Sequence, residues 1–552
     1  MPNITDTKNL PIYNCHAHIF TGKHVPPWLG KKIIPWPFPY LISLPLVLPL
    51  IKLLSHHRKY HIPRILDKIA RDLPFAFNQL WLHHPVTYFI ARMISTIITC
   101  IALLLLISYL NYKVTDIEWL TICINYPRQY IPFLLQILIV PFGLLVIPSG
   151  RKLLLLLLQF LRKIPGPATW ELFQRYHTLG RFALHASQRG IFEKLISYYP
   201  EGTRFLILPM DMTYMAAGGV SKSYYSQLLE LRILKRTHPK RDQLLPFVFA
   251  DPRRLAEQPA YYDIIHGLFD NCGFTGIKIY PALGYYPFDK HLLKLFLWAS
   301  QNSIPIVTHA IRGIIFYRGL KQQTWNYHPV FKDSQGQPLK LYSFQNVDFI
   351  NNFTHPLNYI CLFEEPYLRQ VLTYYSLLQP LDAFTVELLS LFGYTNSQTP
   401  LKHDLSQLKM CFGHFGGENE WNRYLTNDKS YFDNLFASNS AQTYPFMPDY
   451  VSKNIQQLWQ STSWFSIIRN CIMKYDNVYA DISFTLHELN IITLLKECLT
   501  IPKLQDRILF GTDFYVVSHK KADKEIWIDS KSDFTPMELD RLARLNPQTF
   551  LY

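Results

Sequence analysis

Two histidines separated by one residue stand at the end of a short apolar run near the start of the chain. Residues 11–20 read Pro-Ile-Tyr-Asn-Cys-His-Ala-His-Ile-Phe, which predicts a strand that ends in His16 and His18. Side chains two residues apart on a strand leave the same face. Two imidazoles on one face near the end of a strand can share one metal ion, so this pair is a candidate for part of a metal site.

Further polar residues follow later apolar runs, in chain order. They are Lys278, His309, His414, Asp481 and Asp513. A single His or Asp after a strand is usually a satisfied polar residue or a helix cap. Polar groups at the ends of several successive strands indicate a common site, because in a closed barrel they all face one mouth.

The elements that must position these residues are short apolar runs alternating with amphipathic stretches. We predict strands over 12–15, 204–209, 244–250, 276–280, 304–308, 409–412, 477–481 and 507–510. Helices are predicted between them, for example over 223–235, 289–300 and 454–475. Continuous apolar strands that alternate with helices are typical of a parallel sheet with both faces covered. Eight such units predict an α/β fold, the (β/α)8 TIM barrel.

The ordered series of motifs resembles the amidohydrolase superfamily. It is most similar to the amidohydrolase-related branch that contains aminocarboxymuconate-semialdehyde decarboxylase. The segments that carry the resemblance are His-Ala-His at 16–18, Thr-His-Ala at 308–310, Gly-His-Phe-Gly-Gly at 413–417 and Gly-Thr-Asp at 511–513. The resemblance covers residues 11–22 and about 200–552, and the region from 25 to about 165 lies outside it.

The resemblance implies a site with one divalent metal ion, most simply Zn²⁺, with Mn, Fe or Co as alternatives. It makes His16, His18, His309 and Asp513 the metal ligands. His414 would then polarise the substrate or orient the attacking water. This donor set suits Zn²⁺ and leaves a position open for water, and Asp513 can accept that water's proton.

Two basic residues near the site keep more than one interpretation. Lys278 either faces the substrate, closes the barrel mouth by a salt bridge, or is carboxylated and bridges two metals, as in some members of the superfamily. Arg312 either pairs with an anionic substrate or is solvated. Asp211, Asp251 and Asp481 are explained by helix caps or loop ties.

The function expected from these residues is metal-dependent hydrolysis of an amide, ester or lactone carbonyl in a small molecule. One alternative is nonoxidative decarboxylation of an unsaturated or aromatic acid with the same ligands. Another is a catalytically inactive, membrane-bound binding protein. The oligomeric state stays open, a homo-oligomer included.

An apolar and basic insertion interrupts the predicted barrel after its first strand. Residues 23–163 hold 16 Lys/Arg and 4 Asp/Glu, a net of +12 out of +15 for the chain. Basic residues flanking apolar spans are attracted to a cytoplasmic membrane surface. With no RNP motif, zinc finger or basic helix in the sequence, the positive charge does not indicate nucleic-acid binding.

Two uncharged runs in this insertion approach the length of a transmembrane helix, roughly 20 residues. Residues 93–110 hold 18 residues without a charge and 130–148 hold 19. The excess of Lys/Arg outside the runs predicts a transmembrane hairpin, about 87–110 and 130–148, with the barrel on the cytoplasmic side. Eight unpaired Cys fit that reducing compartment. The alternative is that both runs are buried core helices.

Length and composition fit this organisation. The 552 residues, with 17% charged residues and a mean hydropathy of +0.01, suit a soluble body that carries a limited membrane element. We predict three parts: 1–24 with the first strand, 25–165 as the insertion, and 166–552 as the rest of the barrel. A second, lid-like insertion is predicted at about 313–405, with residues 355–358 packed over the barrel mouth.

Overall fold

The computed structural model describes the barrel and a few positions of the apolar insertion. Described are residues 10–26, scattered positions from 93 to 135, residue 185, and 187–552 except 314, 342–344, 427–447 and 489. The chain divides into two compact units. One consists of Met1–Pro39 with Arg175–Tyr552, and the other of Tyr40–Gln174.

Eight parallel strands form one sheet in the first unit. In spatial order they are β1 (Tyr13–Ala17), β2 (Arg204–Ile207), β3 (Leu244–Phe249), β4 (Gly276–Ile279), β5 (Ile306–Ile311), β8 (Met410–Gly416), β9 (Val478–Asp481) and β10 (Ile508–Leu509). All eight predicted strands are present, with ends that differ by a few residues. Each strand lies beside its predecessor in the sheet, which is the strand order expected of a (β/α)8 barrel.

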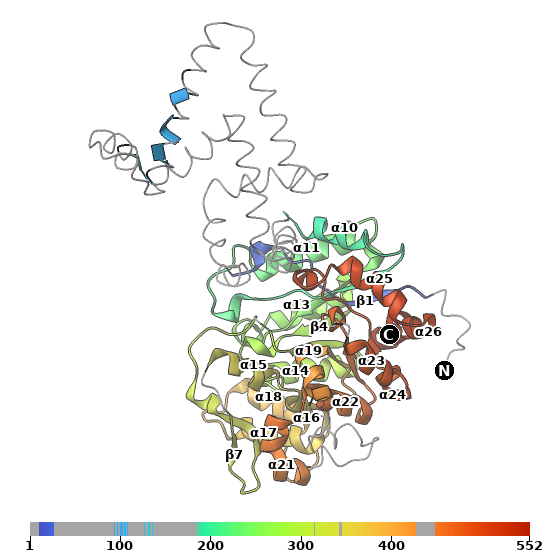
Figure 1. Cartoon of the computed structure of the whole chain (residues 1–552). Helices are drawn as coiled ribbons and strands as arrows, with labels where there is room; N and C mark the ends of the chain where they lie inside the picture. Colours follow the sequence, from blue (N-terminus) through green and yellow to red (C-terminus); the bar gives the residue numbers. More distant parts are fainter. Residues whose placement is uncertain are drawn as a thin grey trace. The chain divides into compact units, whose positions relative to one another are not determined.

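The first and last strands meet and close the sheet. The amide of Cys15 donates to the carbonyl of Phe510 at 2.8 Å, and Ala17 forms a parallel bridge with Phe514. In Figure 1 the blue strand β1 accordingly lies among the red C-terminal elements. The predicted barrel is therefore confirmed.

A bulge in β1 turns the two histidines into the barrel. Cys15 belongs to the apolar cluster that fills the interior, together with Val307 and Cys411. Strict alternation would turn the next residue, His16, outward. The register of β1 against β2 shifts between Asn14 and Ala17, which inserts an extra residue and lets Cys15 and His16 both face inward.

Helices surround the sheet (Figure 1). They are α10 (Gln188–Ile196), α11 (Tyr224–Thr237), α12 (Pro252–Glu257), α13 (Tyr261–Cys272), α14 (Lys290–Gln301), α19 (Glu418–Thr426), α21 (Pro448–Ser461), α22 (Trp464–Lys474), α23 (Ile491–Leu499), α24 (Pro502–Gln505), α25 (Asp523–Asp533), α26 (Pro536–Asp540) and α27 (Asn546–Leu551). The predicted helix over 454–475 is two helices, because the side chain of Ser463 caps α22 by accepting from the amide of Ser466.

The segment between β5 and β8 is folded. It holds a hairpin of β6 (Tyr327–Lys332) and β7 (Pro338–Lys340), then α15 (Asn346–Thr354), η7 (Pro356–Tyr359), α16 (Ile360–Phe363), α17 (Glu365–Leu377) and α18 (Ala383–Phe392). Helix α15 contacts η5 (Pro281–Leu283), which follows β4. This part of the segment therefore lies at the carboxyl end of the barrel.

Tyr359, directly after residues 355–358, packs on the outside of the barrel, and the placement of 355–358 over the mouth stays a prediction. The hydroxyl of Tyr359 hydrogen-bonds Thr308, and its ring lies 4.8 Å from that of Phe412. Thr308 precedes the inward-facing His309, so its side chain faces outward. The ring of His355 stacks on that of Trp459, with centroids 4.0 Å apart.

Within the described residues no helix is both long and apolar enough to cross a bilayer. The predicted spans 87–110 and 130–148 lie outside the described residues, apart from scattered positions. The same holds for most of the predicted insertion 25–165.

Candidate metal centre

Three ligands predicted from the sequence converge at the carboxyl end of the barrel. His16 and His18 lie on and just after β1, and Asp513 follows β10. Nε2 of His16 lies 3.7 Å from Oδ1 of Asp513, and Nε2 of His18 lies 3.1 Å from the same oxygen. All three residues are buried. Two imidazoles and one carboxylate thus face a common point.

Hydrogen bonds at the far side of each ring fix which nitrogen faces that point. Nδ1 of His16 lies 2.9 Å from Oδ2 of Asp481, and Nδ1 of His18 lies 2.7 Å from the carbonyl of Leu208. Both partners accept, so both rings carry their proton on Nδ1. Nε2 of each ring is then the nitrogen that faces Asp513 and that would bind a metal, the arrangement typical of metal-binding histidines.

His309 reaches the same region from β5. Its ring stacks on Tyr280 with centroids 3.9 Å apart and lies 4.9 Å from the ring of His414. Burial lowers the pKa of His309 well below its usual range, and the positive charges of neighbouring His and Lys side chains lower it further. The imidazole is therefore neutral, as metal binding requires.

Buried nitrogens without a hydrogen bond mark the place of a cation. Nε2 of His16 and Nε2 of His309 make no hydrogen bond to any group that the structure describes. An unmade hydrogen bond in a buried site is costly. Neutral imidazoles beside a carboxylate are the donors that Zn²⁺ and Mn²⁺ accept, so the residues present fit the metal that the sequence implies.

His414 lies beside this cluster. Donor atoms of His16, His414 and Asp513 all lie within 4.8 Å of one another, and the rings of His16 and His414 have centroids 4.5 Å apart. Burial lowers the pKa of His414 to about 3, with His16 as the next cause. The ring is therefore neutral at physiological pH.

Ser483 sets the tautomer of His414. The hydroxyl of Ser483 donates its proton to Asp481, and it lies 2.9 Å from Nδ1 of His414. That hydroxyl can therefore only accept from His414, so the proton of the imidazole is on Nδ1. Nε2 then offers a lone pair. This tautomer suits the orientation of a water molecule, and not donation to an oxyanion.

Asp481 contributes more than a loop tie. Besides His16 it accepts from the amide of His414 at 3.0 Å and from Ser483. One carboxylate thus orients two histidines of the cluster. In the sequence Asp481 stands at the end of a strand like the other candidates, but a helix cap or loop tie explained it equally well, because a capping and an orienting carboxylate look alike in sequence.

Left-handed backbone occurs at the site. His414 has φ of +67° and Asp513 has φ of +62°. Such conformations are uncommon for residues other than glycine, and they concentrate at functional sites. With this left-handed backbone both side chains point into the barrel, whereas an extended backbone would direct them away from it.

Two glycines leave room for His16. A Cβ on Gly413 would lie 2.7 Å from the carbonyl oxygen of Thr308 and 3.1 Å from Cε1 of His16. A Cβ on Gly511 would lie 2.9 Å from Cβ of His16. The glycines of the Gly-His and Gly-Thr-Asp motifs therefore allow close approach to the imidazole.

Lys278 on β4 is fully buried and unpaired. Its Nζ makes no hydrogen bond to any described group. Burial lowers its pKa to about 8, while Asp481 and Asp513 act in the opposite direction. Of the interpretations that the sequence left open, the salt bridge at the barrel mouth is absent among the described residues. Lys278 is thus a buried cation beside the histidine cluster.

Arg312 lies outside the cluster. Its guanidinium is 3.1 Å from Oε1 of buried Glu420 and packs over the ring of Trp464.

Two of the aspartates that the sequence assigned to helix caps or loop ties have such roles. Asp251 caps α12, and Asp211 pairs with Arg254 at 2.6 Å.

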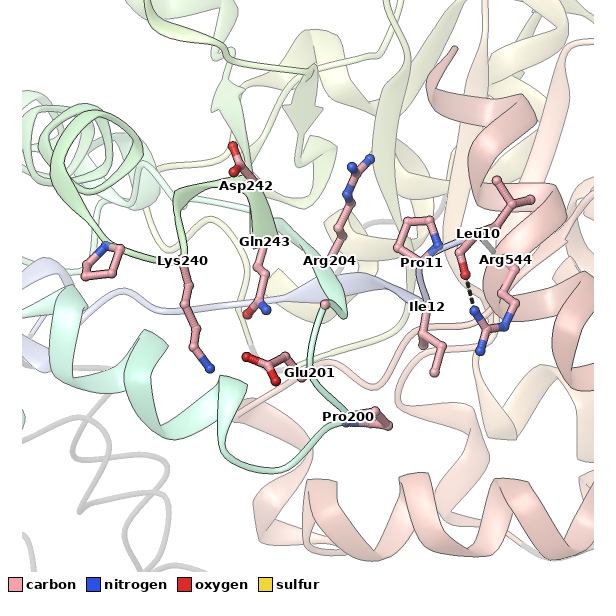
Figure 2. A pocket seen from close by; sticks show the side chains of 12 residues that line it. Leu10, Pro11, Ile12, Pro200, Glu201, Arg204, Lys240, Asp242, Gln243 and Arg544 are labelled. Carbon is pink, nitrogen blue, oxygen red and sulfur yellow. Dashed lines mark hydrogen bonds between the residues drawn. The ribbon is translucent and has the colours of Figure 1, made fainter. Parts of the chain in front are cut away.

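A groove at the opposite end of the barrel contains none of the predicted site residues. Figure 2 shows its charged lining of both signs, including Glu201, Arg204 and Lys240, and the hydrogen bond from Arg544 to the carbonyl of Leu10. It lies at the amino ends of β1, β2 and β3. Residues at this end of a barrel contribute to stability, whereas catalytic residues lie at the carboxyl end.

Neither a family model nor a curated protein matches the sequence. Solved structures do match at low identity. A dihydroxybenzoic acid decarboxylase from Polaromonas sp. JS666 with bound manganese is 14% identical over 68% of this chain and 89% of its own, with a TM-score of 0.36. A 5-carboxyvanillate decarboxylase from Novosphingobium aromaticivorans, complexed with manganese, is 12% identical over 73% and 92%, with a TM-score of 0.34.

An amidohydrolase from Mycobacterium avium subsp. paratuberculosis is 12% identical over 66% of this chain and 74% of its own, with a TM-score of 0.30. Matches with such low identities and TM-scores do not assign a function to this chain, so its function must be inferred from the residues of the site.

Proposed function

We propose that this chain is a metal-dependent hydrolase of the amidohydrolase superfamily that acts on a small molecule. The observation that carries the proposal is the convergence of Nε2 of His16 and His18 on Asp513, with Nε2 of His309 and of His16 lacking a hydrogen bond. We assign His16, His18, His309 and Asp513 as ligands of one divalent cation. When bound, that cation supplies Lewis acidity at the barrel mouth.

Three side chains around the proposed metal site have further roles. Asp513, whose Oδ1 faces His16 and His18, would accept the proton of the attacking water. The lone pair on Nε2 of His414 orients that water, because Ser483 holds the proton on Nδ1. Asp481 keeps the ring of His16 in place through its bond to Nδ1.

A second candidate is decarboxylation of an unsaturated or aromatic acid, and Lys278 bears on the substrate of both reactions. A buried ammonium without a partner favours binding of an anion, and a substrate carboxylate supplies one. Hydrolysis of an anionic amide, ester or lactone uses the same contact. The lysine therefore favours an acidic substrate for either reaction.

A substrate panel separates the two reactions. The purified protein, supplied with Zn²⁺ or Mn²⁺, is incubated with acids, amides, esters and lactones, and both CO₂ and proton release are recorded. Proton or amine release without CO₂ supports the hydrolase. Release of CO₂ from an acid, with no turnover of amides, esters or lactones, shows instead that the protein is a decarboxylase.

We further propose that the barrel is held at the cytoplasmic face of a membrane by a hairpin over 87–110 and 130–148. The support is the pair of uncharged runs and the Lys/Arg excess beside them. A thiol placed at position 120 should react with an impermeant reagent in intact cells, and one placed in 440–450 should not. Labelling of the barrel position, or release of the protein by carbonate, contradicts this placement.

A further inference from the structure

Asn14 on β1 makes four hydrogen bonds in a fully buried position. Its Nδ2 donates to Oγ1 of Thr512 at 2.7 Å and to the hydroxyl of Tyr199 at 2.9 Å. Its Oδ1 accepts from the amides of His16 and Thr512, each at 3.2 Å. Two donated and two accepted bonds use the whole capacity of a side-chain amide.

Thr512 extends these bonds to helix α25. Its hydroxyl accepts from Asn14 and donates to Oδ1 of Asp523. Asp523 is buried at the start of α25, and burial raises its pKa to about 7. A continuous path of hydrogen bonds therefore joins β1, the Gly-Thr-Asp segment and α25.

Backbone hydrogen bonds cross the same seam of the barrel, from the amide of Asp513 to the carbonyl of His16 at 2.9 Å and from the amide of His18 to the carbonyl of Phe514 at 2.6 Å, and the side-chain path runs beside them. Strand β10 spans only Ile508–Leu509, so the residues that carry Asp513 lie beyond its regular pairing with β9. Asn14 precedes His16 by two residues, and Thr512 precedes Asp513 by one. The side-chain bonds thus cross the closing seam of the barrel directly beside two of the proposed ligands.

We propose that Asn14 and Thr512 form a clamp that holds His16 and Asp513 at the spacing needed to bind the metal, with Tyr199 and Asp523 supporting it. This rests on the proposed metal site. The clamp residues are positioning residues, since they reach the site through the backbone of His16 and Asp513. Second-layer hydrogen bonds of this kind typically change metal affinity by about 10–100-fold.

The test compares two substitutions that differ in one hydroxyl. Thr512→Val keeps the shape of the side chain and removes both hydroxyl hydrogen bonds, whereas Thr512→Ser keeps them. We expect Thr512→Val to weaken Mn²⁺ binding by about 10–100-fold in calorimetry of the metal-stripped full chain, and Thr512→Ser to stay within about threefold of wild type. Thr354→Val is the matched control, because Thr354 is buried in α15 and its hydroxyl makes no hydrogen bond.

Amide hydrogen exchange of the metal-free protein gives a second readout. The clamp predicts faster exchange at 15–18 and 511–514 in Thr512→Val, and not in Thr512→Ser or Thr354→Val. If a folded Thr512→Val variant binds Mn²⁺ and exchanges its amides as the wild-type protein does, the clamp is wrong. Absence of Mn²⁺ binding in wild type, with the exchange difference present, contradicts the metal site and leaves the clamp supported. If Thr512→Val does not fold, Tyr199→Phe removes one acceptor of Asn14 and carries the same comparison.

Discussion

At the scale of single residues, His16 connects most of the site. One of its ring nitrogens is bonded to Asp481 and the other faces Asp513, while its amide is bonded to Asn14. A histidine with its other polar atoms hydrogen-bonded is held in one orientation, so Nε2 of His16, which makes no hydrogen bond to a described group, is positioned for the proposed cation.

Substitution of the ligands tests their roles. His16→Ala, His309→Ala and Asp513→Ala should each remove most of the bound metal, because each takes away one donor. His414→Ala should keep the metal and lower turnover by about 100-fold or more, since it removes the group that orients the water. Metal analysis after gel filtration measures the first effect. Loss of metal in the His414 variant, with retention in the His309 variant, reverses the assignment.

Replacement of Lys278 by Met should separate stability from function. The pKa of Lys278 falls from 10.5 to about 8 on burial. Below pH 8 the lysine is charged in both states, and its desolvation opposes folding by about 3 kcal/mol. We expect Lys278→Met to raise the melting temperature at pH 7, to keep the metal, and to raise KM for acidic substrates. Loss of metal in this variant shows instead that Lys278 is a metal ligand.

At the scale of elements, the strands bring the ligands together only where they depart from regular geometry. The bulge in β1 turns His16 inward, and left-handed backbone aims His414 and Asp513. Gly413 on β8 provides the space that the ring of His16 occupies. The site thus depends on the ends of strands as much as on the residues that they carry.

Gly413→Ala tests this dependence. The added Cβ would meet the carbonyl of Thr308 at 2.7 Å, so β8 must move away from β5 and the ring of His16 must shift. We expect lower metal affinity and a lower melting temperature. Gly267→Ala in α13 is the control, since nothing lies within 4 Å of the added Cβ. There, alanine should stabilise the helix by up to about 1 kcal/mol. Wild-type metal affinity in Gly413→Ala contradicts the close-packing argument.

Much of this architecture could be predicted from the sequence, because the strands are apolar and each ends in a polar residue. The periodicity placed all eight strands. His16, His18, His414 and Asp513 lie close together, while the assignment of His16, His18, His309 and Asp513 as ligands stays a prediction. The periodicity did not reveal the bulge in β1, which depends on pairing with a strand about 190 residues away. Nor did it separate α21 from α22, since the break is set by one capping bond at Ser463.

At the scale of the whole molecule, buried histidines make stability depend on pH. Burial lowers the pKa of His328 to about 3 and that of His24 and His291 to about 4. The unfolded chain, with a histidine pKa of about 6.5, binds these protons more tightly than the folded protein does. Stability from these groups is therefore complete above pH 6.5 and is lost as the pH falls toward 4. The buried carboxyls of Asp523, Asp289 and Asp251 oppose the trend, because burial raises their pKa values. More histidines than carboxyls are shifted, however, since the pKa values of His16, His309, His355 and His414 are lowered as well.

The metal-free protein should thus unfold more readily at pH 5 than at pH 6.5. His328 alone should account for about 2 kcal/mol of that difference. Urea denaturation at the two pH values measures it, and His328→Gln should show a smaller loss. Equal free energies of unfolding at pH 6.5 and pH 5 would show that these histidines are accessible to protons in the folded state.

The central claim is that the barrel mouth holds a divalent metal ion between His16, His18, His309 and Asp513. Its most direct test is the metal content of the purified chain by mass spectrometry, before and after incubation with Zn²⁺ or Mn²⁺ and gel filtration. We predict about one equivalent of metal in the wild-type protein and almost none in His16→Ala. A wild-type protein with far less than one equivalent, not restored by either cation, contradicts the claim and favours a binding protein without catalytic activity.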